Sequence, residues 1–157
     1  LVFPPLHTND APSAVARLLD LGLEPYLITA TLEGVLGQRL VRNICQRCKE
    51  EFIPTEEVLW ELQLRPSDVE GRTFYRGAGC EHCRGTGYSG RSAIFEVMIL
   101  DDEIRNLINN RSSTNAIREA SRRRGMRTLR ESGLLAIYDG TTTIEEVVAQ
   151  TIYEETE

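Results

Sequence analysis

The sequence predicts a mixed α/β protein that contains a small metal-binding lobe and ends in a bundle of helices. Three observations carry this prediction: apolar residues at helical spacing near both ends, one continuous apolar strand, and four cysteines confined to the middle of the chain. These features divide the chain into three expected parts, residues 1–42, 43–91 and 92–157. A chain of 157 residues is long enough for one domain or a pair of small ones.

The first part is expected to hold the end of a strand and two helices. The apolar residues 1–3 are followed by two prolines, which is typical of a strand that ends there. Asp10 can cap a helix that Gly22 ends. Apolar residues at helical spacing predict a second helix from Pro25 to Val41, although two glycines within it weaken the prediction.

The third part is expected to be a strand followed by a small bundle. Residues 92–100 are mostly apolar and predict the strand. Capping residues and glycines then predict the following helices: one that starts at Asp101 or Asp102, one capped by Thr114 that runs to Arg124, one from Met126 to Tyr138, and a short last one opened by a capping box of Thr143 and Glu146.

The cysteines form two tight pairs, Cys45–Cys48 and Cys80–Cys83, each with two residues between the sulfurs. Such turns direct both thiolates at one point, and two of them complete a tetrahedral zinc site with Zn–S bonds of about 2.3 Å. Disulfides, a redox-active pair and simple burial are the alternatives, and the spacing favours zinc over them. Four protein ligands leave no open position, so the zinc would be structural and His82 would not be a ligand.

The segment between the cysteine pairs holds a short amphipathic helix at residues 55–62 and then a polar loop. Few apolar residues are available to fix this segment, whereas zinc binding in small sites supplies about 10–16 kcal/mol of folding free energy. We therefore expect the lobe to fold only with metal.

Charge and hydropathy exclude several classes of function. The net charge of −6 makes the chain a poor nucleic-acid binder, because non-specific binding needs a basic surface. No apolar run approaches the roughly 18 residues of a membrane-spanning helix. The chain starts at Leu1 without a methionine, and we expect it to be a piece of a longer protein.

Four ordered motifs resemble the secretion ATPases that power type II secretion and type IV pilus assembly. They are Leu6-His7-Thr8-Asn9-Asp10-Ala11, then Gln38-Arg39-Leu40-Val41-Arg42, then the second cysteine pair with its run from Gly79 to Arg91, and Ile94-Phe95-Glu96. The resemblance covers essentially the whole chain. The paired cysteines resemble the secretion and pilus-extension branches more than the pilus-retraction branch.

The resemblance implies that the chain is the C-terminal portion of a RecA-like P-loop ATPase domain. The Gly-rich phosphate-binding loop and the acidic elements that hold magnesium do not occur in this sequence, so the chain is not expected to hydrolyse ATP alone. The resemblance implies ATP and Mg²⁺ binding by the parent, a homo-hexamer, an inner-membrane platform protein as partner, and a cytoplasmic location at the inner-membrane face. Pro4-Pro5 depart from the family's usual Ser-Thr.

The same resemblance assigns roles to individual residues. It implies that His7 lies near the γ-phosphate as a catalytic residue, although a structural histidine would give the same pattern. Arg39 and Arg91 are expected to contact phosphate or a neighbouring subunit, since guanidinium groups bind phosphate and carboxylate oxygens with two parallel bonds. A solvated arginine on a helix or loop is the alternative for both residues. Glu96 is expected to pair with an arginine. The cluster Arg122-Arg123-Arg124 suits a helix C-terminus, with an acidic partner as the alternative.

Two stand-alone zinc-binding modules are alternative functions. Residues 80–87 fit the Cys-x-x-Cys-x-Gly-x-Gly unit of the Hsp40 co-chaperone zinc domain, but no glycines follow the first cysteine pair. A nucleic-acid-binding zinc ribbon is weak, because residues 45–91 carry seven Lys or Arg against eight Asp or Glu.

Overall fold

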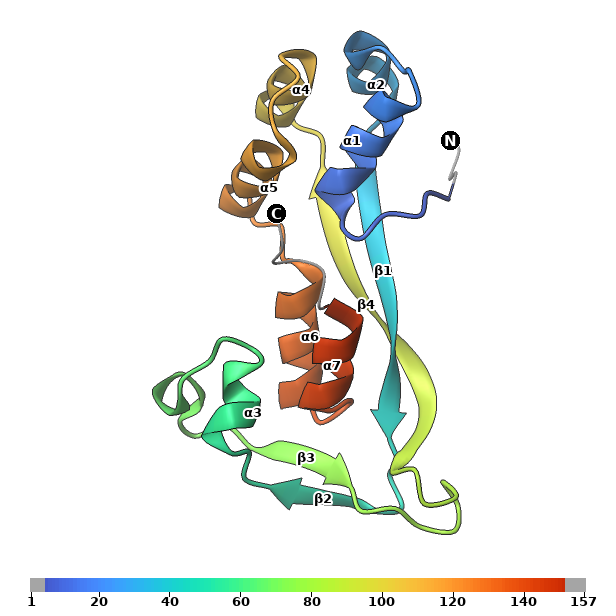
Figure 1. Ribbon diagram of the computed structural model, residues 1–157, viewed down its shortest axis with the longest axis vertical. Coiled ribbons are helices and arrows are strands. Elements are labelled where there is room, and N and C mark those ends of the chain that lie inside the picture. Colours follow the sequence, from blue (N-terminus) through green and yellow to red (C-terminus); the bar gives the residue numbers. More distant parts are fainter. Residues whose placement is uncertain (1–4, 152–157) are drawn as a thin grey trace. The chain divides into compact units, whose positions relative to one another are not determined.

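Two long strands, β1 (Gly34–Ile44) and β4 (Tyr88–Ile99), pair in a two-stranded sheet, and their arrows point in opposite directions in Figure 1. The structure is a computed structural model that describes residues 5–151. The chain divides into two units, each made of two separate stretches. Unit 1 comprises the residues up to Gln38 with Phe95–Leu129, and unit 2 comprises Arg39–Ile94 with the residues from Arg130 on. Each long strand therefore has residues in both units.

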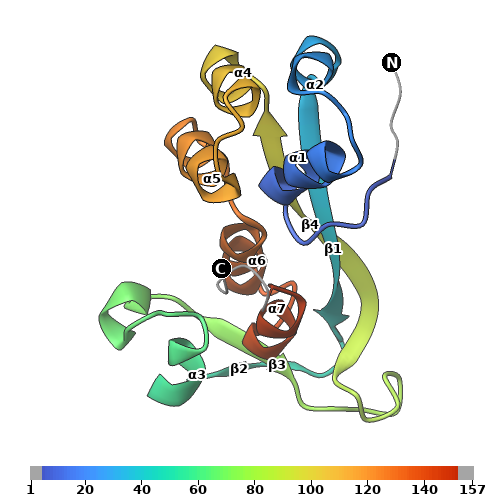
Figure 2. The same ribbon diagram turned by 45° about the horizontal axis from the view of Figure 1, so that its top comes forward.

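Helices dominate unit 1, where they gather beside the strand ends that belong to this unit (Figure 2). Asp10 caps the first helix as predicted, since its Oδ1 accepts a hydrogen bond of 2.9 Å from the Ser13 N–H. Asp101 caps another in the same way, with 3.0 Å to the Ile104 N–H. The helices of this unit are α1 (Ala11–Asp20), α2 (Pro25–Thr31), α4 (Asp102–Asn109) and α5 (Thr114–Arg123).

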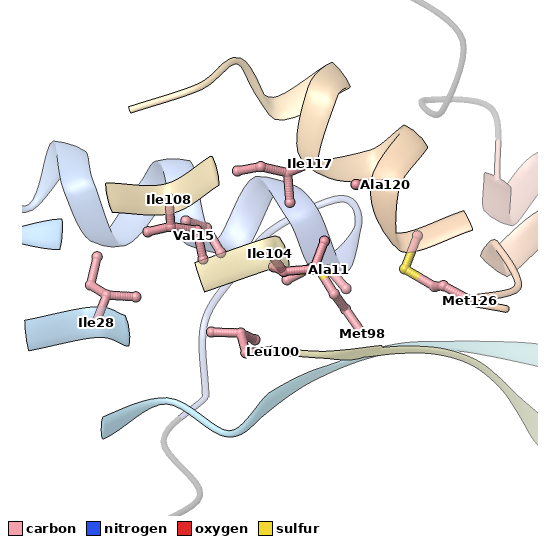
Figure 3. Close-up of a cluster of buried hydrophobic side chains, with 10 residues drawn as sticks. All are labelled: Ala11, Val15, Ile28, Met98, Leu100, Ile104, Ile108, Ile117, Ala120 and Met126. Atoms are coloured by element: carbon pink, nitrogen blue, oxygen red, sulfur yellow. The ribbon is translucent and has the colours of Figure 1, made fainter. Parts of the chain in front are cut away.

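The core of unit 1 is one apolar cluster to which all these helices and β4 contribute (Figure 3). Met98, Ile104 and Ile108 are completely buried in it. Its buried members are Ala11, Val15, Ile28, Met98, Leu100, Ile104, Ile108, Ile117, Ala120 and Met126.

Unit 2 contains a second, shorter hairpin. Strands β2 (Lys49–Phe52) and β3 (Phe74–Gly77) are antiparallel, with Lys49 opposite Gly77 and Phe52 opposite Phe74. A second apolar cluster joins this lobe to the last two helices, and its buried members are Leu59, Leu62, Val69, Phe74, Ile137, Ile144 and Val147. The remaining elements are α3 (Glu56–Trp60), the 3₁₀ helix η1 (Pro66–Val69), α6 (Leu129–Tyr138), whose first residue belongs to unit 1, and α7 (Ile144–Thr151).

The predicted helix from Pro25 to Val41 is wrong over its second half. The helix ends at Thr31, and β1 follows from Gly34. The two glycines explain the difference, because they bring β1 close to β4. A Cβ at Gly34 would lie 3.1 Å from the Met98 carbonyl oxygen, and one at Gly37 would lie 3.5 Å from the Cβ of Glu96.

Three smaller predictions also need correction. Ser113, and not Thr114, caps α5, since its Oγ accepts from the Ala116 N–H at 3.2 Å. Helix α6 begins at Leu129, three residues after the predicted start. Thr143 accepts from the Glu146 N–H, but the Glu146 carboxylate binds Arg42 instead of closing the predicted capping box.

The remaining element predictions are confirmed or lie outside the described residues. The strand at 92–100 corresponds to β4, and the helix at 55–62 corresponds to α3. The predicted strand end at residues 1–3 lies outside the described part. The helices after β4 are divided between the two units, so the expected parts 1–42, 43–91 and 92–157 do not coincide with the units and stay a prediction. Across residues 5–151, no helix has both the length and the apolar character that crossing a membrane requires.

Candidate metal centre

All four cysteines of unit 2 meet at one point. The sulfur atoms of Cys45, Cys48, Cys80 and Cys83 lie within 4.8 Å of one another. Individual Sγ–Sγ distances are 3.7 Å for Cys80–Cys83, 3.8 Å for Cys48–Cys83 and 3.9 Å for Cys45–Cys80. A tetrahedron with Zn–S bonds of 2.3 Å has edges of about 3.8 Å, whereas a disulfide needs about 2.05 Å. The cysteines are therefore free thiols arranged to bind a metal ion, and they fit zinc.

Backbone hydrogen bonds form the two turns that present the cysteines. In the first turn, directly after β1, the Cys48 N–H donates to the Cys45 carbonyl at 3.2 Å. In the second turn, the Gly85 N–H donates to the Cys80 carbonyl at 2.9 Å. The Cys45 N–H also donates to the Gly87 carbonyl, which joins the two turns directly. The loops that follow β1 and β3 accordingly lie side by side in Figures 1 and 2.

The second turn requires glycine at the two positions that flank it. The backbones of Gly77 and Gly87 approach so closely that a Cβ on Gly77 would overlap the carbonyl group of Gly87. Gly87 has a φ of +77°, in the left-handed region that favours glycine. The glycines around the second cysteine pair therefore serve the geometry of the metal centre.

Hydrogen bonds also set the ionisation of the metal-free thiols. Desolvation raises the pKa of Cys83, but N–H groups of Cys80 and Gly87, each 3.2 Å from its sulfur, lower the pKa to about 6. Desolvation and the neighbouring thiols raise the pKa of Cys48 to about 12. The thiol of Cys83 therefore ionises more easily than that of Cys48, and metal binding must displace the proton of Cys48.

An ion pair fixes the end of β1 against the start of α7, beside the metal centre. The backbone N–H and the Nε of Arg42 donate to the two carboxylate oxygens of Glu146 at 3.0 and 2.8 Å. The Arg42 guanidinium also lies 4.1 Å from the ring centroid of Tyr88, whose hydroxyl is 2.8 Å from the Thr143 Oγ1. Desolvation raises the pKa of Glu146, but Arg42 more than offsets this and holds the pKa below its usual value.

The other predicted site residues lie outside the cage. His82 is exposed, as expected for a residue that is not a ligand. Arg39 on β1 is half-buried and Arg91 on β4 is exposed, and both belong to unit 2. His7 is exposed in the segment before α1, in unit 1. The catalytic role of His7 and the phosphate-binding roles of the two arginines stay predictions.

Glu96 has a structural role that differs from the predicted one. It is 2% exposed, and its two oxygens accept hydrogen bonds from the Ala11 N–H at 2.7 Å and the Leu129 N–H at 3.2 Å. The predicted pairing with an arginine is wrong, because Arg118 binds Asp10 at 2.6 Å. Burial raises the pKa of Glu96. The feature of the sequence that could have indicated this buried role is a glutamate at an inward-facing position of an apolar strand.

Two arginines of the cluster Arg122-Arg123-Arg124, at the end of α5, form ion pairs with acidic residues of unit 1. Arg123 and Arg124 lie 3.0 and 3.1 Å from the carboxylate of Glu103, and Arg124 also lies 3.2 Å from Asp101. These residues connect the end of α5 to the start of α4.

Fold and site together define a small α/β protein with a four-cysteine metal centre. The sequence matches the family described as "Type II/IV secretion system protein" over residues 1–149, and the chain belongs to this family of type II secretion and type IV pilus assembly ATPases. The resemblance seen in the sequence motifs is therefore confirmed.

Individual relatives agree with this assignment. The chain is 51% identical over 97% of its length to "Type IV pilus assembly ATPase PilB" of Thermus thermophilus, and 44% identical over 96% to PilB of Myxococcus xanthus. It is also 44% identical over 96% to "Type II secretion system protein HxcR" of Pseudomonas aeruginosa. The chain spans 17%, 27% and 28% of the lengths of these three proteins.

Proposed function

We propose that this chain is the C-terminal part of a hexameric ATPase that couples ATP binding and hydrolysis to assembly of a type IV pilus or a type II secretion pseudopilus. The observation that carries the proposal is the 51% identity to a pilus assembly ATPase across nearly the whole chain. In this proposal, the RecA-like nucleotide-binding core, with its phosphate-binding loop and magnesium ligands, belongs to the parent protein, which would act in the cytoplasm against an inner-membrane platform protein.

The zinc ion would be structural. Four thiolates fill a tetrahedral coordination shell, so no position remains for a reactive water. The cage ties the end of β1 to the loop that leads into β4, and the Arg42–Glu146 ion pair holds the same region against α7. We propose that this part of the chain moves as a stiff body when ATP binds between subunits, since rigid-body movement of domains is a common way to transmit a binding event.

His7, Arg39 and Arg91 would contribute to the nucleotide site or to the interface between subunits of the parent. An exposed imidazole and two guanidinium groups on a sheet suit contacts with phosphate oxygens, which present negative charge and hydrogen-bond acceptors.

Substitutions in the longer ATPase test these assignments. We expect His7→Ala, Arg39→Ala and Arg91→Ala to lower ATP hydrolysis while the zinc content stays at one ion per chain. Replacement of Cys45 and Cys80 by serine should remove zinc and abolish pilus or pseudopilus assembly. Arg17→Ala, at an exposed position on α1, is the matched control and should change neither measurement.

Two outcomes would contradict the proposal. If the cysteine variant still formed rings and supported transport, the zinc centre would not stiffen a moving part. If all three single substitutions hydrolysed ATP like the control, these residues would have no place in the nucleotide site.

A further inference from the structure

The zinc-binding lobe of unit 2 carries an apolar groove that the metal centre does not use. The groove has a volume of about 500 Å³ and lies between β2, α3, η1 and β3. Its apolar lining comes mainly from Phe52, Leu59, Val69 and Phe74. These residues belong to the apolar cluster of unit 2, or pack against it, so the groove opens directly onto a hydrophobic core.

One large apolar side chain of the groove faces the solvent, and so does the residue that follows Leu59 in the sequence. Ile53 lines the groove and is 94% exposed, although isoleucine is among the residue types most often buried. Trp60, the one tryptophan of the chain, follows the groove residue Leu59 on α3 and is 62% exposed. An exposed apolar side chain beside a groove of this size is typical of a surface that binds another polypeptide.

The charge around the groove is acidic. Glu51 and Glu56 line it, and both are exposed. Arg72 also lines it, but its guanidinium carbon lies 4.7 Å from the ring centroid of Tyr138. The segment from 49 to 74 carries seven acidic and three basic side chains, a net charge of −4. The groove therefore selects against acidic ligands and favours basic ones.

We propose that this groove binds a basic amphipathic segment of a partner protein. Apolar side chains of the segment, spaced like those on one face of a helix, would fill the groove against Phe52 and Phe74 and cover Ile53. Lysine or arginine side chains beside them would pair with Glu51 and Glu56. This combination of apolar anchors and rim charges is the usual chemistry of a helix bound in a groove. The proposal does not depend on ATP hydrolysis.

Binding of designed peptides to the zinc-loaded chain tests the proposal. The probe is a fluorescent 15-residue peptide of leucine and lysine, with leucines at helical spacing. One comparison peptide has glutamate in place of lysine, and another has serine in place of leucine. We expect only the leucine–lysine peptide to bind, with weaker binding at higher salt. Its binding should shift the amide NMR signals of residues 51–59 and 66–74, and the fluorescence of Trp60.

Variants separate the groove from the rest of the surface. Glu51→Lys combined with Glu56→Lys should weaken binding of the leucine–lysine peptide by about tenfold or more, which corresponds to about 1.4 kcal/mol. Ile53→Ser, at a position that contributes little to folding, should weaken it about fivefold or more by removing an apolar contact. The control combines Asp20→Lys with Glu145→Lys, which changes the charge equally at exposed positions that do not line the groove, and should alter binding less than about twofold.

Several results would overturn the proposal. They are equal binding of the leucine–glutamate peptide, unchanged binding by both groove variants, or NMR shifts confined to other residues. Concentration-dependent dimerisation that Ile53→Ser abolishes would assign the groove to a second copy of this chain instead. Ile53→Ser keeps the test decisive even if the double glutamate variant fails to fold.

Discussion

Glu96 is a carboxylate buried within unit 1, and two backbone N–H groups compensate for its burial. Those donors belong to Ala11, at the start of α1, and to Leu129, at the start of α6. A helix start leaves N–H groups without intrahelical partners, and an acidic side chain there also interacts favourably with the helix dipole. One side chain on β4 therefore stabilises the first residues of two helices.

Glu96→Gln should destabilise the protein by about 1–3 kcal/mol, because glutamine has one acceptor oxygen and leaves a buried N–H facing another donor. Denaturant unfolding measures this change. Glu103→Gln is the control, since Glu103 is 38% exposed and solvent screens its pairing with arginines, so its loss should destabilise the protein much less. Equal unfolding free energies for the two variants would show that the buried hydrogen bonds of Glu96 do not matter.

The Arg42–Glu146 pair predicts a pH dependence with a definite sign. Arg42 holds the pKa of Glu146 below its ordinary value of 4.5, so folding favours the ionised form. The resulting stability is complete above about pH 4.5 and is lost as the pH falls through the lowered pKa. We expect Glu146→Gln to lower the unfolding free energy by about 1–3 kcal/mol at pH 7, and by progressively less below pH 4.5.

Glu50→Gln provides the comparison for this prediction. Glu50 pairs with Arg76 at 2.8 Å, but both side chains are well exposed, at 44% and 59%. Its replacement should change stability by at most about 1 kcal/mol at any pH. A pH-independent difference between Glu146→Gln and the native sequence would contradict the role assigned to the ion pair.

At the scale of single elements, the region around β1 shows how far the sequence alone could lead. Helix caps such as Asp10 and Asp101 were predictable because they act within one turn of chain. The apolar residues of β1 fit a helical period as well as a strand period, and the choice depends on close contact with β4, about sixty residues later. The same limit applies to Glu96, whose two donors come from distant parts of the chain.

The metal centre was predictable because its ligands have a spacing that local turns dictate. Cys-x-x-Cys forces two sulfurs together through a turn of four residues, whatever the rest of the fold does. What the spacing did not indicate is the close approach of Gly77 and Gly87 on either side of the second turn, or the hydrogen bond from the Cys45 N–H to the Gly87 carbonyl that joins the two turns. The roles of His7, Arg39 and Arg91 depend on a nucleotide and on neighbouring subunits, and these roles remain predictions.

Gly77→Ala should disrupt the metal centre, because its Cβ would collide with the backbone of Gly87, which cannot move like a flexible side chain. We expect zinc affinity to fall by about 10–100-fold, as for changes that disturb the surroundings of metal ligands. Competition with a chromophoric chelator measures the affinity. Gly71→Ala is the control, since its Cβ would meet no atom within 4 Å and only backbone strain at φ +76° would result. Unchanged affinity in Gly77→Ala would contradict the assigned contact.

At the scale of the whole molecule, we expect the two units to depend differently on metal. Unit 1 has its own apolar cluster and contains no cysteine. Unit 2 contains all four cysteines and a second apolar cluster, which joins α3 and β3 to α6 and α7. The sequence alone suggested that few apolar residues hold the zinc-binding lobe, and this cluster shows that part of the lobe also has a hydrophobic anchor.

Removal of zinc by a strong chelator should therefore have a graded effect. The turns at residues 44–49 and 77–90 should lose amide protection completely, because zinc supplies about 10–16 kcal/mol in small sites and these turns bury little apolar surface. Amides near Leu59 and Phe74 should lose protection in part, and those of Ile104 and Ile117 should keep it. Hydrogen exchange measured with and without chelator checks this order. Added zinc should restore the lost amide protection. Undiminished protection of the cysteine turns without metal would mean that backbone hydrogen bonds alone hold them.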